Sequence, residues 1–339
     1  MLTFKGIQLH NVTELEEVCE SGGYAMLRVP KTIENGLNDM AKERNSLNTG
    51  VELRFVPIDD EVTITMQLLA ENDVSTSMVY YGNIQAGWQE GQKVVYNKPT
   101  EIVVKKPEKL EYLRKIANDF GHPFDPEVVR IILPAKKCTI IDVKGKCQPP
   151  REEQVPQKRY LAYGSSITHG SLSGLPVTTY AFKVAENLRS DLINLGYAGS
   201  AAMEPCMADY IAERKDWDFA TLEMGINVIN YMSEEEFENR VRYFVSKIAS
   251  ENPDKTVVCI DMFYFSLDYE NNEKADVYRN IVIKVVEELN LANVSYINGK
   301  SLLDNMDGLS ADLVHPNVRG MQKIAENLTS QLKSLILGE

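Results

Sequence analysis

The sequence predicts a mixed α/β protein in which a β-rich domain precedes a domain built on a parallel sheet. Three observations lead to this prediction. The 339 residues exceed the size that one hydrophobic core usually serves. Short strands of alternating polarity fill the first part of the chain, and strands alternate with amphipathic helices in the second. We expect domains at residues 1–147 and 159–339, joined by a linker at residues 148–158.

The first domain is predicted from its many short strands. Residues 51–55 and 62–68 alternate apolar and polar side chains, which is the period of a half-buried strand. Glycine, proline, asparagine and aspartate separate the other predicted strands, which span residues 24–29, 77–81, 93–96, 101–104, 128–133 and 139–143. Such a density of short strands predicts a β-sandwich or jelly roll.

The second domain follows a polar, proline-rich segment, which is typical of a semi-rigid linker. Its predicted strands span residues 159–163, 191–195, 219–224, 256–261 and 294–297. The segments between them carry apolar residues at helical spacing, and a last amphipathic helix closes the chain. Strands alternating with helices imply parallel strands joined by helical crossovers.

Composition and the amino terminus predict a cytoplasmic protein that does not enter membranes. Apolar residues make up 44% of the chain and charged residues 25%, as in water-soluble globular proteins. No apolar run approaches the length needed to cross a bilayer. The first residues lack the apolar core and the cleavage site of a secretory signal.

Charge and cysteine content exclude several classes of ligand. The net charge of −13 argues against nucleic-acid binding and favours a neutral or cationic ligand over a polyanion. The five cysteines are scattered and odd in number, so we expect free thiols and no thiolate metal site. Cys138 and Cys147 could face each other across a hairpin, but we expect them to be unpaired.

A glycine-bounded turn places a serine directly after the first strand of the second domain. Residues 164–170 read Gly-Ser-Ser-Ile-Thr-His-Gly. Ser166 therefore lies at the carboxyl end of a predicted parallel strand, where open α/β sheets carry out their chemistry. Its backbone N–H can also face a developing oxyanion. Ser166 is the candidate nucleophile.

A second segment supplies a base and a group to orient it. Asp312 precedes His315 by three residues, in a turn that Pro316 ends by starting the last helix. This spacing lets the carboxylate reach Nδ1 of the imidazole and leaves Nε2 free to face a serine. We expect Ser166, His315 and Asp312 to form a catalytic triad.

Two more loops that follow predicted strands suggest donors for an oxyanion. The loop at residues 194–200 brings a flexible backbone with Gly199 to the edge of the sheet, and the loop at residues 222–227 brings the side-chain amide of Asn227. Together with the N–H of Ser166, these groups could form an oxyanion hole.

These four segments, in this order, resemble the conserved blocks of the SGNH (GDSL) esterase and lipase superfamily. The resemblance covers residues 159–339. It implies a flavodoxin-like three-layer α/β/α fold, a Ser166 nucleophile with Asp312 and His315, and an oxyanion hole from Ser166, Gly199 and Asn227. The form of the first block and the preceding β-rich domain are more similar to two-domain carbohydrate esterases than to secreted lipases.

The sequence departs from the pattern of this superfamily at three positions. Ser165 replaces the usual aspartate of the first block, and Ile226 and Val228 replace the usual glycine and aspartate around Asn227. None of these residues is the nucleophile, the base or an oxyanion donor. We therefore expect activity to survive, with effects on how the first turn is held and on what the pocket accepts.

Other candidate residues have structural explanations that we prefer. We expect His169 to be a solvated loop residue, and His10 and His122 to be structural. The glycines at 196 and 199 lack the spacing of a dinucleotide-binding loop. Residues 80–88 combine aromatic, small and amide side chains that suit stacking on a sugar, although core packing is the preferred interpretation. The β domain could instead form one wall of the catalytic cleft.

We interpret the chain as a serine esterase that acts on an acetylated saccharide or another small O-acylated compound. No metal or organic cofactor is required, and neither nucleic acid nor a membrane is an expected partner. Acyl transfer, thioester hydrolysis or lysophospholipid hydrolysis on the same triad is the alternative. A noncatalytic sugar-binding protein is the alternative from another class, and the intact set of Ser166, His315, Asp312 and Asn227 counts against it.

Overall fold

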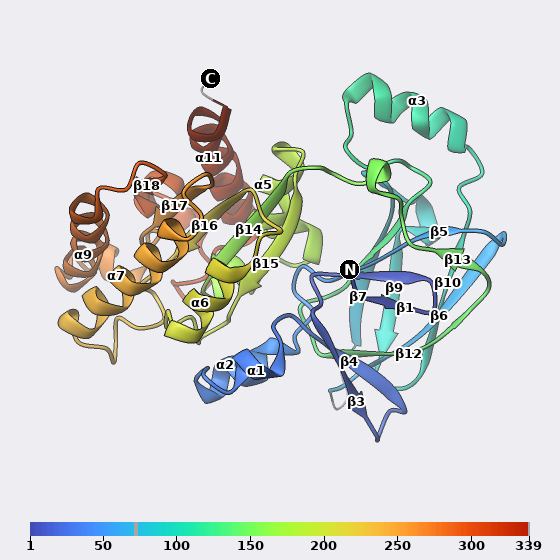
Figure 1. Cartoon of the computed structure of the whole chain (residues 1–339), viewed down its shortest axis with the longest axis horizontal. Helices are drawn as coiled ribbons and strands as arrows, with labels where there is room; N and C mark the ends of the chain where they lie inside the picture. The colour runs from blue at the N-terminus through green and yellow to red at the C-terminus, as the bar shows by residue number, and fades with distance from the viewer. Residues whose placement is uncertain (71–73, 338–339) are drawn as a thin grey trace.

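Two antiparallel sheets form the N-terminal domain of the computed structural model, which describes residues 1–70 and 74–337 (Figure 1). The first sheet has the strand order β1-β2-β5-β11-β7-β8, with β13 beside β5 and β9 beside β7. Its strands are β1 (Thr3–Phe4), β2 (Ile7–His10), β5 (Glu52–Pro57), β7 (Val74–Tyr81), β8 (Ile84–Gln85), β9 (Gln92–Tyr96), β11 (Val129–Ile132) and β13 (Cys147–Gln148).

The second sheet of this domain has the order β10-β6-β12-β4-β3. Its strands are β3 (Glu14–Val18), β4 (Gly23–Leu27), β6 (Glu61–Leu68), β10 (Thr100–Lys105) and β12 (Cys138–Lys144). Apolar side chains of both sheets, such as Leu53 and Ile64, form one buried core between them. The predicted β-sandwich is confirmed; its jelly-roll connectivity stays a prediction. Cys138 and Cys147 are free thiols.

Three helices of the N-terminal domain were not predicted from the sequence. They are α1 (Lys31–Glu34), α2 (Asp39–Asn45) and α3 (Leu110–Phe120). The side chain of Asn38 caps α2 by accepting a hydrogen bond from the N–H of Ala41. In Figure 1, α1 and α2 leave the sandwich and lie below the second domain, near α6.

The second domain contains the predicted parallel sheet. Its described strands follow the order β15-β14-β16-β17-β18, and every neighbouring pair is parallel. They are β14 (Arg159–Gly164), β15 (Asp191–Gly196), β16 (Phe219–Glu223), β17 (Thr256–Ile260) and β18 (Val294–Ile297). This is the strand order of flavodoxin-like folds, so the predicted fold class is confirmed. The division of the chain at residues 148–158 stays a prediction.

Helices cover both faces of this sheet. They are α4 (Ser166–His169), α5 (Tyr180–Asn187), α6 (Pro205–Glu213), α7 (Glu234–Ser250), α8 (Ser266–Tyr269), α9 (Lys274–Leu289), α10 (Gly299–Leu302) and α11 (Val318–Leu337). Short 3-10 turns are η1 (Trp88–Glu90), η2 (Glu152–Gln154), η3 (Pro176–Thr178) and η4 (Met306–Gly308). Alternation along β14 directs Leu161 and Tyr163 toward α6 and α7, and Tyr160 and Ala162 toward α5 and α11.

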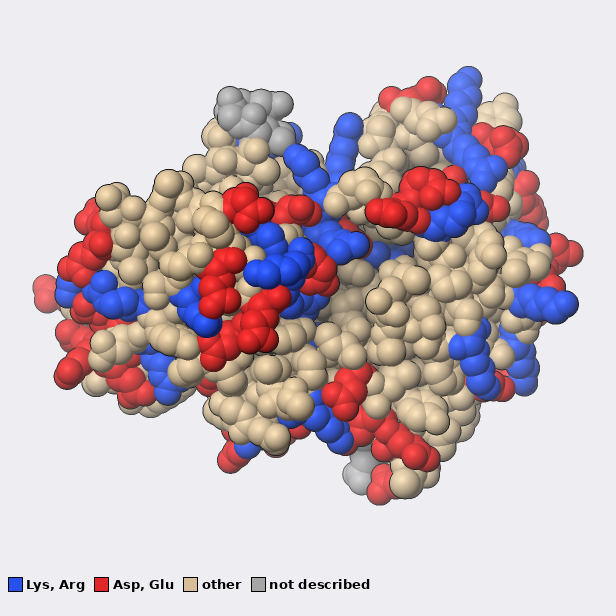
Figure 2. Space-filling model, viewed as in Figure 1, with Lys and Arg blue, Asp and Glu red and all other residues tan. Residues whose placement is uncertain are grey.

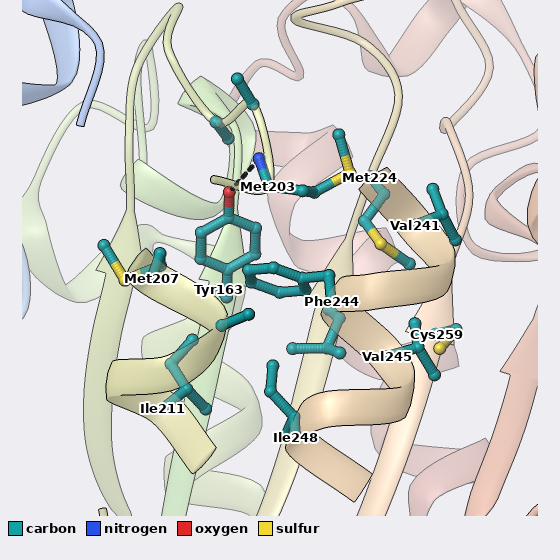
Figure 3. Close-up of a cluster of buried hydrophobic side chains, with 14 of the residues drawn as sticks. Tyr163, Met203, Met207, Ile211, Met224, Val241, Phe244, Val245, Ile248 and Cys259 are labelled. Carbon is teal, nitrogen blue, oxygen red and sulfur yellow. Dashed lines mark hydrogen bonds between the residues drawn. The ribbon is translucent and has the colours of Figure 1, made fainter. Parts of the chain in front are cut away.

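A buried tyrosine joins the sheet to a loop of the site. The Tyr163 ring packs on Phe244 of α7 at 4.6 Å between ring centroids (Figure 3). Its hydroxyl accepts a hydrogen bond of 3.0 Å from the N–H of Met203. Because this bond is buried, it helps to fix the backbone that follows Gly199.

The outer edge of β15 is covered by polar groups of the N-terminal domain. The carbonyl of Leu192 contacts the ring of His10, and the carbonyl of Asn194 accepts a hydrogen bond from the Asn11 amide. Arg28 donates to the carbonyls of Asn194 and Gly196. Backbone acceptors that would otherwise face solvent are thus satisfied by the other domain.

A buried ion network lies at the same interface. Arg54 makes a bidentate pair with Asp191, at 2.6 and 2.7 Å. The carboxylate of Glu52 bridges Arg54 and Arg130 at 2.7 to 2.8 Å. Burial raises the pKa of Asp191, but the charges of Arg54 and His10 and the hydrogen bonds from Arg54 together outweigh that effect and hold the pKa below its ordinary value. Two cations and two anions balance each other out of contact with water.

The sandwich also packs on the α/β domain through apolar residues. Tyr80 and Met78 of β7 belong to a core that they share with Phe182 of α5. For Tyr80, the expected core packing is confirmed. Trp88 is fully exposed.

Figure 2 shows the hollow between the two domains on one face, with basic side chains gathered at its upper part. No described helix is long and apolar enough to span a bilayer.

Asp191→Ala should lower the free energy of unfolding by about 3–5 kcal/mol, because it leaves Arg54 buried without its bidentate partner. Urea unfolding followed by circular dichroism measures the change. Glu101→Ala is the matched control: its ion pair with Lys144 is exposed to water, so the loss should be much smaller than in Asp191→Ala. Equal losses in the two variants would contradict a stabilising role for the interface network.

Candidate active site

The turn after β14 has room only for glycine. A Cβ atom on Gly164 would lie 2.3 Å from Oγ1 of Thr168 and 2.5 Å from Oε2 of Glu223. Ser165 follows as the N-cap of α4, and its hydroxyl accepts a hydrogen bond from the N–H of Ile167. A serine thus performs the capping that an aspartate could perform here. Ser166 begins the helix, where backbone N–H groups have no intrahelical acceptor.

The structure brings the three predicted triad residues together. Nε2 of His315 lies 2.7 Å from Oγ of Ser166, and its Nδ1 lies 2.7 Å from Oδ2 of Asp312. The serine is 149 residues from the histidine along the chain, so the fold alone creates this contact. Both distances are those of hydrogen bonds.

The turn that carries Asp312 orients its carboxylate toward His315. Its Oδ1 accepts hydrogen bonds from the N–H groups of Val314 and His315 and from the Ser310 hydroxyl, at 2.7 to 3.0 Å. Leu313 adopts a left-handed backbone, with φ of 60°, which closes the turn. Burial raises the pKa of Asp312, but these hydrogen bonds outweigh it and hold the pKa well below its ordinary value. An ionised carboxylate can only accept, so Nδ1 of His315 carries the proton.

The predicted oxyanion donors lie on the wall of the same cavity. The cavity has a volume of about 560 Å³, and Ser166, Gly199, Asn227, Asp312 and His315 all line it. Oδ1 of Asn227 accepts a hydrogen bond from the N–H of Ala201, which fixes the amide and leaves its NH₂ group for a ligand. Gly199 has a φ of +72°, a conformation that side chains rarely adopt.

The N-terminal domain contributes to this cavity. Met40 and Arg44 of α2 line it, and the sulfur of Met40 would lie 3.0 Å from a Cβ atom on Gly199. The first domain therefore forms one wall of the cleft, as the sequence analysis suggested. It does so through α2, a helix that the sequence analysis did not predict.

A buried carboxylate beneath the turn was missed in the sequence analysis. Oε2 of Glu223, at the end of β16, accepts hydrogen bonds from the N–H of Ser165 at 2.6 Å and from the hydroxyl of Thr168 at 3.1 Å. Its Oε1 has no partner among the described residues. A carboxylate in the apolar run 219–224 is the sequence signal that could have found it. Glu223 is placed to position the turn that holds Ser166.

His169 is not the solvated loop residue that we expected. It ends α4, its side chain is buried, and its Nδ1 lies 3.1 Å from the carbonyl of Gly196. Burial and, next, the charge of Arg28 lower its pKa to about 3. The N-terminal domain covers this turn, since the hydroxyl of Thr49 bonds to the His169 carbonyl. His169 is therefore a neutral structural residue.

Comparison with known proteins identifies the family. Residues 157–333 match the model of the GDSL-like lipase/acylhydrolase family, and the chain belongs to that family. This places it among esterases and acyl hydrolases of the SGNH type. A search of curated proteins finds no match.

Solved structures share the fold over most of this chain. A salicylyl-acyltransferase from a tetracycline biosynthetic pathway aligns with a TM-score of 0.78 at 18% identity, covering 98% of this chain and 95% of that chain. A family two carbohydrate esterase from Clostridium thermocellum, in complex with cellohexaose, gives 0.60 at 15%, covering 85% and 92%. An acetyl xylan esterase from the rumen bacterium Butyrivibrio proteoclasticus gives 0.56 at 14%, covering 86% and 91%. At these identities the likeness establishes the fold.

Glu223→Gln should gain stability relative to the wild type as pH rises. Burial raises the pKa of Glu223, against the opposing hydrogen bonds from Ser165 and Thr168. The folded wild type therefore holds this proton more tightly than the unfolded chain does. The stabilising effect of this proton is complete below the ordinary pKa of 4.5. The effect is lost as pH rises through the pKa of Glu223 in the folded protein.

Urea unfolding of both proteins at about pH 5 and about pH 8 tests this expectation. Glutamine has no such proton, so the free energy of unfolding of the variant minus that of the wild type should be larger at the higher pH. A difference that is independent of pH would show that Glu223 does not titrate with a raised pKa.

Proposed function

We propose that this protein hydrolyses an acyl ester through a covalent acyl-enzyme on Ser166, and that its substrate is an acetyl ester of a saccharide or of another small compound. One observation carries the proposal: the hydrogen-bonded series from Ser166 through His315 to Asp312, with 2.7 Å at each step. A nucleophile, a base and an orienting carboxylate in this order are what serine-based acyl transfer needs.

The first half of the reaction forms the acyl-enzyme. Oγ of Ser166 attacks the ester carbonyl while its proton passes to Nε2 of His315. The carboxylate of Asp312 keeps the other proton on Nδ1 and stabilises the imidazolium. The N–H groups of Ser166 and Gly199 and the amide of Asn227 donate to the oxyanion. The intermediate then collapses, and the imidazolium gives its proton to the departing alcohol.

The second half releases the acid. A water molecule gives a proton to His315 and attacks the acyl group on Ser166, the same donors hold the second oxyanion, and the serine recovers its proton. The alcohol leaves with the proton of Ser166, and the proton from water restores it, so the residues end the cycle in their starting protonation states.

The shape of the cavity and the relatives support the substrate class. The cavity is open to the interdomain cleft, so a bulky alcohol can extend out of it while the acyl group sits at Ser166. Two of the proteins that share the fold are a carbohydrate esterase and an acetyl xylan esterase. An acetylated saccharide combines a small acyl group with a large polar alcohol.

Ser166→Ala should abolish turnover of p-nitrophenyl acetate and of acetylated xylo-oligosaccharides, because no other hydroxyl of the described residues is hydrogen-bonded to the His315 ring. Initial rates measure the loss, and a fluorophosphonate probe followed by peptide mass spectrometry should label Ser166 in the wild type. Ser165→Ala is the matched control, and the probe should still label Ser166 in this variant. Labelling at residue 165, or near wild-type turnover in Ser166→Ala, would contradict the assignment. Added methanol that diverts the acyl group from acetate to methyl acetate would reveal acyl transfer by the same site.

Asp312→Asn should lower kcat/KM by at least about a hundredfold at neutral pH, because the amide keeps the shape of the carboxylate but cannot stabilise the imidazolium. Steady-state kinetics on p-nitrophenyl acetate measure the change, and circular dichroism checks the fold. A decrease of only a few fold would mean that His315 is oriented by another group and that the site works as a dyad.

A further inference from the structure

Two cavities meet beside Ser166. The first is the cavity of about 560 Å³ that contains the candidate triad. The second, of about 770 Å³, lies between the domains, where Thr76 of β7 faces the loop at residues 169–176. The two cavities share four lining residues, which are Arg44, Ser171, Leu172 and Ala198. A substrate that starts at Ser166 can therefore extend past Arg44 into the interdomain cavity.

The lining of these two cavities is poor in carboxylates, although the chain as a whole is acidic. The protein has 49 acidic and 36 basic residues, and this excess favoured a neutral or cationic ligand. Among the described residues that line the two cavities, however, the only carboxylate is that of Asp312, which is bound to His315. Arg44 lines both cavities and contributes positive charge where they meet. The charge beside Ser166 on this side of the cleft therefore favours an anion.

Arg44 is held in a fixed position. Its Nε donates a hydrogen bond of 3.2 Å to the carbonyl of Ala198, the residue before Gly199. Its own carbonyl accepts one of 2.8 Å from the buried guanidinium of Arg28. The guanidinium of Arg44 is thus anchored beside the candidate oxyanion hole through one of its three nitrogens.

The two remaining nitrogens of Arg44 are free to bind a ligand. Nη1 lies 3.6 Å from the carboxylate of Glu43, but that side chain is 73% exposed, so water and salt weaken the pair. Nη2 has no hydrogen-bond partner among the described residues. A planar pair of N–H donors matches the two oxygens of a carboxylate or a phosphate.

We propose that Arg44 binds an anionic group, a carboxylate or a phosphate, on the alcohol part of the substrate ester. This inference rests on the proposed function: an acetyl group is uncharged, so the anion must belong to the alcohol. The interdomain cavity is large enough for a sugar ring that carries such a group. The substrate class becomes an O-acetylated acidic saccharide or a similar hydroxy acid.

The test compares acetyl esters that differ only in charge. Wild-type kcat/KM is measured for an O-acetylated methyl glucuronide, for the matching neutral glucoside, and for an acetylated sugar phosphate that distinguishes phosphate from carboxylate. The charged ester should be preferred by about tenfold or more, mainly through KM, since a charge-assisted hydrogen bond contributes that much. The preference should shrink as ionic strength rises.

Substitutions assign the preference to one side chain. Arg44→Gln should bring the ratio of kcat/KM for the charged ester to kcat/KM for the neutral ester close to one. Arg44→Lys keeps the charge but lacks the planar pair of N–H donors, so it should retain part of the preference. Lys42→Gln is the matched control. It removes a positive charge from the same helix, but Lys42 pairs with the exposed Asp39 and does not line either cavity, so the wild-type ratio should remain.

Failure of the inference is separable from failure of the proposed function. If the wild type hydrolyses charged and neutral acetyl esters equally, or if Arg44→Gln keeps the wild-type ratio, the inference is wrong and the esterase stands. If the wild type hydrolyses no ester, the proposed function is wrong. Calorimetric binding of methyl glucuronide and methyl glucoside to Ser166→Ala, with and without Arg44→Gln, then decides the role of Arg44: equal affinities would overturn it.

Discussion

A charged side chain without a carboxylate partner joins the two domains. Arg28 is buried, no described carboxylate forms an ion pair with it, and burial lowers its pKa. It is held by three carbonyls, those of Asn194, Gly196 and Arg44, and by the ring of Tyr197 at 4.7 Å. Burying a guanidinium is costly unless its donors are satisfied. The carbonyls satisfy the donors at Nη1 and Nη2 only when β15 and α2 are both in place, whereas Nε has no partner among the described residues. Arg28 thus couples the wall of the cleft to the sheet.

Besides their contacts with one another, the loops of the candidate site are held by side chains from other segments. Glu223 holds the turn before Ser166, and the hydroxyl of Tyr163 holds the loop after Gly199. Asn38 donates to the carbonyl of Ser200 and so fastens α2 to the same loop. Each support comes from a different strand or segment. The atoms around the ester carbonyl are therefore positioned before a substrate binds, which is what electrostatic stabilisation of an oxyanion requires.

The sequence predicted the parallel sheet almost residue by residue, because each strand is a short apolar run between polar loops. Ser166, His315 and Asp312 were predicted because their spacing and order match one chemistry. Local sequence patterns failed to predict structure at positions where contacts between residues distant in the sequence determine it. The helix α2 buries little apolar surface of its own and is held by Asn38 and Arg28. His169 looked like a loop residue because nothing near it in sequence reveals that residues around Thr49 cover it. The positions of Glu223 and Arg44 also depend on contacts with residues that are distant in the sequence, so local patterns do not reveal them.

The covered edge of β15 has a consequence for the evolution and engineering of this chain. An edge strand with unpaired carbonyls is a template on which another chain can add a strand, and natural proteins protect such edges. Here the protection comes from His10, Asn11 and Arg28, which belong to the other domain. Without these residues the edge of β15 would present its backbone acceptors to neighbouring chains. The sandwich thus protects one edge of the sheet in the domain that follows it, besides shaping its cleft.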